Sequence, residues 1–221
     1  MTGDPKICIA FNGGAAGDFL TLLLAQQLEY QSTIEVDKNG MVLNPPGQNF
    51  KKACREFFIE KFNVNTFNNI KFDTVVNTHY CYREIIDLFP DCKFYYIDDS
   101  KYFSITTNTY IKKRLDPINK TLLDWLHETN SFLQIKKIRN LTNDQLQKIM
   151  INDWNKCLQG WKNLGLTPIN LADMLNKEKC CNIVTSIVQS TVDKEKFNQT
   201  YDRWATKNTE LITQVLNTLY D

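Results

Sequence analysis

Lys6-Ile7-Cys8-Ile9-Ala10-Phe11-Asn12 is followed directly by Gly13-Gly14-Ala15-Ala16-Gly17-Asp18 and then by an apolar run from Phe19 to Leu28. The first run is typical of a buried strand and the last of a helix, so the stretch predicts a strand, a loop and a helix in succession. Because the loop residues have little or no side chain, their backbone N–H groups can converge at the helix N-terminus. There the helix dipole favours an anion such as phosphate or sulfate. The simpler alternative is that the glycines only turn the strand tightly into the helix.

The rest of the chain alternates runs that suit strands with runs that suit helices. Further strands are predicted at Asp73 to His79, Lys93 to Ile97 and Thr167 to Leu171, and a short hairpin around Asn39-Gly40. Helices are predicted at Phe50 to Phe62, Tyr82 to Phe89, after Lys101 as far as Arg114, Asn119 to Trp161, Ala172 to Asn176, Cys180 to Gln189 and from Asp193 onward. This order predicts an α/β fold, a mostly parallel central sheet flanked by helices with a helical C-terminal half, in one domain spanning residues 1–221.

Composition narrows the classes of function. The chain has 26 basic and 25 acidic residues, so it has no global field to hold nucleic acid or an anionic membrane. It has neither a signal-peptide pattern nor an apolar run long enough to cross a bilayer, so we expect a cytoplasmic protein. Seven cysteines without a C-x-x-C pair argue against a disulfide framework or a zinc site, and most should be small buried apolar residues. The richness in Asn, Lys and Ile hints at an AT-rich coding genome, such as that of a virus.

Several polar residues are predicted to lie at one edge of the sheet. In parallel sheets ligands bind beyond the carboxyl ends of the strands, and the Gly-rich loop, His79 and Asp98 to Lys101 all follow predicted strands. An imidazole at this edge can accept a hydroxyl proton near neutral pH, although it can equally serve as a hydrogen-bonding group at a strand end. Asp98 and Asp99 could hold a metal ion, but a simple turn after the strand explains them as well.

The order of these pieces resembles the P-loop sulfotransferases, which transfer a sulfuryl group from 3′-phosphoadenosine 5′-phosphosulfate (PAPS) to a hydroxyl or amine. Four segments carry the resemblance: Ile7 to Phe19, Asn77-Thr78-His79, Cys92 to Thr106 and Ile169 to Leu175. It implies PAPS as the cofactor, no metal, and a small-molecule or glycan acceptor. By the same resemblance His79 is the general base. The expected cofactor-binding residues are Gly13, Gly14, Ala15, Ala16, Gly17, Asp18, Lys101 and Thr106.

Two positions depart from the pattern of that family. The family's loop contains a Lys that neutralises the leaving phosphate, and this loop has none. The family places an Arg after the third strand for the 3′-phosphate, whereas this chain has Asp98, a carboxylate that would repel the phosphate. Thr106 stands at the family's Ser position and can still donate a hydrogen bond. The nearest replacement cations are Lys101, Lys112, Lys113 and Arg114.

The resemblance and the two departures from it leave two candidate functions. One is a divergent sulfotransferase with His79 as base. The other is a catalytically inactive sulfotransferase-like fold that acts as a binding or structural subunit with a protein partner, for instance in a virus particle or larger assembly. Its location would then be the host cytoplasm or the virion. A nucleoside-triphosphate hydrolase or kinase is disfavoured because the pattern G-x-x-x-x-G-K-[ST] is absent from the sequence.

Overall fold

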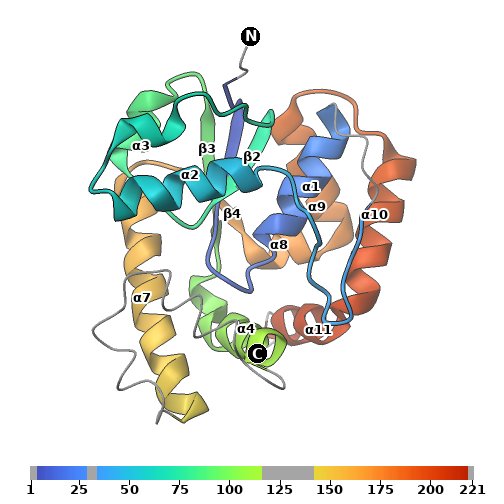
Figure 1. Cartoon of the computed structure of the whole chain (residues 1–221). Helices are drawn as coiled ribbons and strands as arrows, with labels where there is room; N and C mark the ends of the chain where they lie inside the picture. The colour runs from blue at the N-terminus through green and yellow to red at the C-terminus, as the bar shows by residue number, and fades with distance from the viewer. Residues whose placement is uncertain (1–3, 29–33, 116–141, 219–221) are drawn as a thin grey trace.

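A sheet of four parallel strands lies at the centre of the molecule (Figure 1). The computed structural model describes residues 4–28, 34–115 and 142–218. The strands are β1 (Ile7–Ala10), β2 (Val75–Thr78), β3 (Lys93–Asp98) and β4 (Thr167–Asn170), in the spatial order β2-β1-β3-β4. The four predicted strands are thereby confirmed, and so is the α/β fold with a parallel sheet. Because every pairing is parallel, the carboxyl ends of all four strands meet at one edge.

Alternate residues of β1 point to opposite faces of the sheet, and each face has its own helices. Ile7 and Ile9 join one core cluster, whereas Cys8 and Ala10 join two others. The first face is covered by α1 (Gly17–Leu28), α8 (Leu171–Leu175), α9 (Lys177–Val188), α10 (Lys194–Lys207) and α11 (Thr209–Asn217). The second is covered by α2 (Gln48–Ile59), α3 (Arg83–Leu88), α4 (Phe103–Leu115) and α7 (Asn143–Asn163), with the short helix η1 (Val64–Phe67). The short helix η2 (Ser100–Tyr102) contributes Tyr102 to the core of the first face. Burial of β1 and β2 along their whole length explains the continuous apolar runs at these strands.

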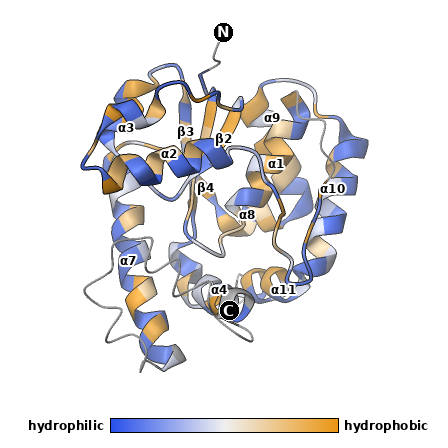
Figure 2. Ribbon diagram, in the orientation of Figure 1, coloured by the Kyte–Doolittle hydropathy of each residue, from blue (hydrophilic) through white to orange (hydrophobic). Residues whose placement is uncertain are grey.

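The first helix is buried on nearly every side. Phe19, Leu20, Leu23 and Leu24 are at most 1% exposed, and Figure 2 shows α1 as largely apolar, whereas α2 and α10 present hydrophilic residues outward. The ring of Phe19 stacks on that of Trp204 in α10, with 4.0 Å between the ring centroids. The C-terminal helices therefore complete the core around the N-terminal strand-loop-helix unit. No helix in the described parts of the chain is long and apolar enough to span a membrane.

Three predicted elements differ from the structure in their extent. The helix predicted to continue from Asp193 is wrong, since α10 and α11 are separate helices divided at Asn208. The buried amide of Asn208 donates to the carbonyl oxygens of Gly40 and Trp204, which ties the break to the turn of the hairpin. The expected hairpin is reduced to one bridge between Val36 and Val42. Helix α2 stops at Ile59 because Lys61 and Phe62 adopt positive φ values.

The long helical region predicted from Asn119 to Trp161 is only partly described. Residues 116–141 lie outside the described ranges, and α7 covers the remainder of the prediction. Helix α7 begins with a capping box. The Thr142 hydroxyl accepts from the N–H of Gln145, and the Gln145 side chain accepts from the N–H of Thr142. This reciprocal pair satisfies two backbone donors that a helix start leaves open, which explains why the helix begins there.

The cysteines behave as small apolar residues, as predicted. All seven are free, and Cys8, Cys54, Cys81, Cys92 and Cys180 are buried. Burial raises the pKa of Cys81 and of Cys92 to about 12, so these thiols stay protonated at neutral pH. A protonated, buried thiol is a poor nucleophile and a poor metal ligand.

Gly17 is required by packing, and this requirement can be tested. A Cβ at Gly17 would overlap the ring of Phe11, which is itself 3% exposed. We expect Gly17→Ala to lower the free energy of unfolding by about 1–3 kcal/mol, the usual cost of overpacking. Gly160 in α7 is the matched control, because a Cβ there meets nothing within 4 Å. Gly160→Ala should raise stability by about 0.5–1 kcal/mol. Urea unfolding of the two variants measures both effects, and equal stability of Gly17→Ala and the parent chain would contradict the assignment.

Candidate functional site

The predicted site residues gather at the carboxyl edge of the sheet. The Gly-rich loop follows β1, His79 follows β2, and Asp98 is the last residue of β3. Because β1 lies between β2 and β3, His79 and Asp99 stand on opposite sides of the loop. The predicted grouping at this edge is therefore present, and it is the place where open α/β sheets bind ligands.

Side chains from α4 and α7 pack against the glycines of the loop. A Cβ at Gly13 would come within 2.7 Å of the Tyr110 ring and 3.2 Å of Trp154. A Cβ at Gly14 would overlap the carbonyl oxygen of Thr106, and Gly14 also has φ of 80°. Both glycines are therefore explained by the close approach of neighbouring helices. The two glycines thus have a structural role beyond the tight turn of strand into helix that was the simpler alternative for the loop.

A cation absent from the loop sequence reaches the loop from α2. The Nζ of Lys51 lies 3.5 Å from Oδ1 of Asp18, in the first turn of α1, and 5.1 Å from the centroid of the Phe11 ring. The side chain of Asp18 places a negative charge near the N-terminus of α1, where the helix dipole favours one. Sequence reasoning missed Lys51, because a single Lys on an amphipathic helix carries no signal of what it will face.

His79 is oriented by the strand beside it. Its Nδ1 lies 2.7 Å from the carbonyl oxygen of Phe11, and the two rings meet edge to face with 4.6 Å between centroids. A carbonyl oxygen can only accept, so Nδ1 carries the proton of this bond, and the basic nitrogen of the neutral ring is Nε2. The half-buried imidazole is thus fixed in one tautomer. The predicted hydrogen-bonding role at a strand end is confirmed, and the role of His79 as a base stays a prediction.

Asp99 is the most unusual ionisable residue of the site. It is fully buried, and its carboxylate accepts hydrogen bonds from Asn12 Nδ2 at 3.0 Å and Thr106 Oγ1 at 3.2 Å. Neither donor carries a charge. Burial raises the pKa of Asp99 to about 7, and the nearby charge of Asp98 adds to the rise. The three residues connect the end of β1, the end of β3 and the first turns of α4, and sequence reasoning assigned Asp99 no such role.

Asp98 points away from Asp99. Its carboxylate accepts from the backbone and hydroxyl of Ser100 and lies 3.4 Å from the Nζ of Lys162. Partial burial acts to raise the pKa of Asp98, but the Ser100 hydrogen bonds and the Lys162 charge outweigh it and lower the pKa. Within the described residues, no group of three His, Cys, Asp or Glu side chains could hold a metal ion. The two aspartates therefore serve different contacts.

The cations expected to replace the missing ones are dispersed. Lys101 is exposed on η2, and Lys112 lies 2.6 Å from Glu210 of α11. The side chains of Lys113 and Arg114 fall outside the described part of the chain. Thr106, expected to donate to a phosphate, is fully buried, and its hydroxyl lies within hydrogen-bond distance of Asp99 and two backbone carbonyls. The structure thus brings Thr106 to the site, but facing inward.

Comparison with protein-family models, with curated proteins and with solved structures gives no match for this chain.

The raised pKa of Asp99 predicts how stability depends on pH. The folded chain holds this proton more tightly than the unfolded chain, so the contribution is complete below about pH 4 and is lost as the pH rises through about 7. Asp99→Asn should remove this loss, because the Thr106 hydroxyl can turn to donate to the carbonyl of Tyr102 and accept from the new amide. We expect the variant to gain stability relative to the parent chain between about pH 4 and pH 7, by at most about 1.4 kcal/mol per pH unit.

Asp98→Asn is the matched control for this measurement. The pKa of Asp98 is lowered, so its contribution is present above about pH 4 and disappears only as the pH falls further. Its stability difference from the parent chain should be flat over the range in which Asp99→Asn changes. Urea unfolding at several pH values measures both variants. A flat difference for Asp99→Asn would show that the carboxyl group does not titrate in this range.

Proposed function

We propose that this chain is a sulfotransferase-like α/β fold that works as a binding or structural subunit and does not carry out PAPS-dependent transfer. The observation that carries the proposal is the inward hydrogen bond from Thr106 to the buried carboxyl of Asp99. The residue expected to hold the 3′-phosphate is used to hold the protein together. A carboxyl group lies on the same side of the loop, and its charge would oppose an incoming phosphate.

The ionic contacts around the loop support the same proposal. Lys51 is paired with Asp18, and Lys162 with Asp98. Lys51 and Lys162 therefore each have an acidic partner from the chain itself, which lowers their attraction for an added anion. Tyr110 and Trp154 lie where the surface of Gly13 would otherwise be open. These contacts favour a loop built for packing over a loop built to cradle a phosphosulfate.

A subunit of this kind would bind another protein through exposed apolar side chains. Exposed apolar side chains follow one another at the end of α2 and in the segment after it, at Ile59, Phe62 and Val64. Phe62 is 43% exposed and is held at φ of 67° while its ring meets Phe57 and Tyr82 edge to face. A large aromatic residue held in this conformation at the surface is typical of a constrained functional segment.

Sulfuryl transfer is the second candidate, because His79 is oriented as a base would be. In that reaction Nε2 of His79 would take the proton of the acceptor hydroxyl while its oxygen attacks the sulfur of PAPS. The bond from sulfur to the phosphate oxygen would break, releasing 3′-phosphoadenosine 5′-phosphate. Lys51, beside Asp18, would supply the cation that the loop itself lacks.

Thermal unfolding with 3′-phosphoadenosine 5′-phosphate separates the two candidates. A binding subunit should show no change in the unfolding midpoint at millimolar nucleotide. A transferase should be stabilised by about 2.7 kcal/mol at about a hundredfold excess over Kd. A rise in the midpoint that is lost in Lys51→Gln would overturn the proposal and favour transfer. Lys52→Gln is the matched control, since Lys52 pairs with Glu56 on the same helix. A loop glycine is a poorer choice, because Gly13, Gly14 and Gly17 are all needed for packing.

A further inference from the structure

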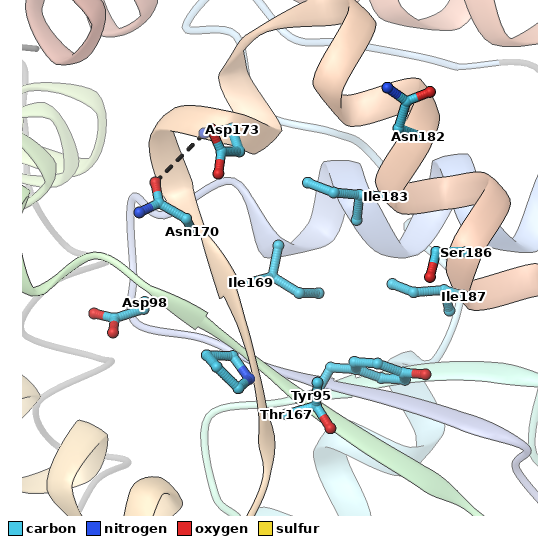
Figure 3. A pocket seen from close by; sticks show the side chains of 11 residues that line it. Tyr95, Asp98, Thr167, Ile169, Asn170, Asp173, Asn182, Ile183, Ser186 and Ile187 are labelled. Carbon is cyan, nitrogen blue, oxygen red and sulfur yellow. Dashed lines mark hydrogen bonds between the residues drawn. The ribbon is translucent and has the colours of Figure 1, made fainter.

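A groove of about 600 Å³ runs along the outer part of the sheet, away from the Gly-rich loop. Its floor is formed by β3 and β4 and its opposite wall by α8 and α9 (Figure 3). Residues 13–18, His79 and Thr106 do not take part in its lining. The groove shares Asp98 with the edge predicted from the sequence but none of these other residues, so what it binds is independent of the proposed function.

The two ends of the groove differ in chemistry. At one end, where β3 and β4 finish and α8 begins, Figure 3 shows Asn170 beside Asp173, with the carboxylate of Asp98 apart from them and turned outward. Toward the other end lie Tyr95 and Ile187, with Ile169 on the floor between the two ends. One end is thus acidic, and apolar side chains line much of the remainder.

The charge at the acidic end is not balanced within the groove. None of the lining residues is Lys, Arg or His. Asp98 meets Lys162 at 3.4 Å, and Asp173 meets Lys179 at 2.6 Å, but neither lysine lines the groove. Both pairs are solvent-accessible, with lysine side chains 37% and 59% exposed, and ion pairs of this kind contribute only about 0–1 kcal/mol. A ligand cation can therefore compete with either lysine at little cost.

The wall formed by α9 adds polar groups to this apolar surface. Asn182 and Ser186 lie one helical turn apart, and Ile183 and Ile187 repeat the same spacing beside them. The groove therefore presents an amide and a hydroxyl on its wall above an apolar floor. This combination suits a compact organic molecule whose body is apolar and whose polar groups are few.

We propose that the groove binds a small organic amine. Its ammonium group lies at the acidic end, next to Asp173 and within the field of Asp98, and its apolar body lies against Ile169, Ile187 and the ring of Tyr95. The volume falls within the range of about 300–1,000 Å³ that is usual for small-molecule sites. A phosphate or sulfate ester is excluded by the same two carboxylates. The ligand class is therefore opposite in charge to the one that the Gly-rich loop suggests.

Three probes of similar shape and different charge test the proposal: phenethylamine, 2-phenylethanol and phenylacetate. Isothermal titration calorimetry near neutral pH should show the amine binding at least about tenfold more tightly than the alcohol, a difference of about 1.4 kcal/mol. The acid should show no binding. Added salt should weaken the amine but not the alcohol. Equal binding of all three, preference for the acid, or no binding of the amine at millimolar concentration would each overturn the proposal.

Variants then place the amine in the groove. Ser186→Trp should fill the groove and abolish amine binding, whereas Thr185→Trp, one residue away and outside the lining, should leave it unchanged. Asp98→Asn combined with Asp173→Asn keeps the shape of the acidic end and should reduce binding of the amine to that of the alcohol. This double variant decides the matter if Ser186→Trp does not fold. Amine binding that survives in both variants would contradict the assignment to this groove.

Discussion

The hydrogen bonds that Asn12 and Thr106 donate to Asp99 hold the carboxyl edge of this molecule together. They connect the residue that opens the Gly-rich loop, the turn after β3 and the start of α4. Because all three residues are buried, these bonds operate without competition from water, and loss of one partner would leave a buried polar group unsatisfied. The position of α4, and with it the contact of Tyr110 and Thr106 with the glycines, depends on this arrangement.

Most of the fold could be predicted because the first two strands are buried along their whole length and the strand and helix runs alternate along the chain. A run such as Ile7 to Ala10, with all four residues buried, has no alternative to a central strand, and its order among the other runs implies parallel pairing. The break between α10 and α11 could not be predicted in the same way. Asn208 interrupts the helix because Gly40, 168 positions earlier, offers its carbonyl as an acceptor, and no local pattern reports a contact at that separation.

The candidate site, like the fold, could be predicted only in part. The sequence places His79, the loop and Asp99 at one edge, since strand order alone decides this. It does not tell which way each side chain faces. Thr106 turns inward to Asp99, Lys51 arrives from α2, and the acidic groove forms from β3, β4, α8 and α9, which are far apart along the chain. Contacts of this kind depend on helix positions, and residue type alone does not specify them.

The burial of α1 also has a consequence during synthesis of the chain on the ribosome. Phe19 stacks on Trp204, and the cluster around α1 takes its remaining members largely from residues 169–215. The residues that bury α1 are therefore absent until nearly the whole sequence has been synthesised. At elongation rates of about 5–20 residues per second, this interval is on the order of ten to forty seconds. During it the nascent chain presents a leucine-rich helix to its surroundings, so dependence on a chaperone is a natural consequence of this chain order.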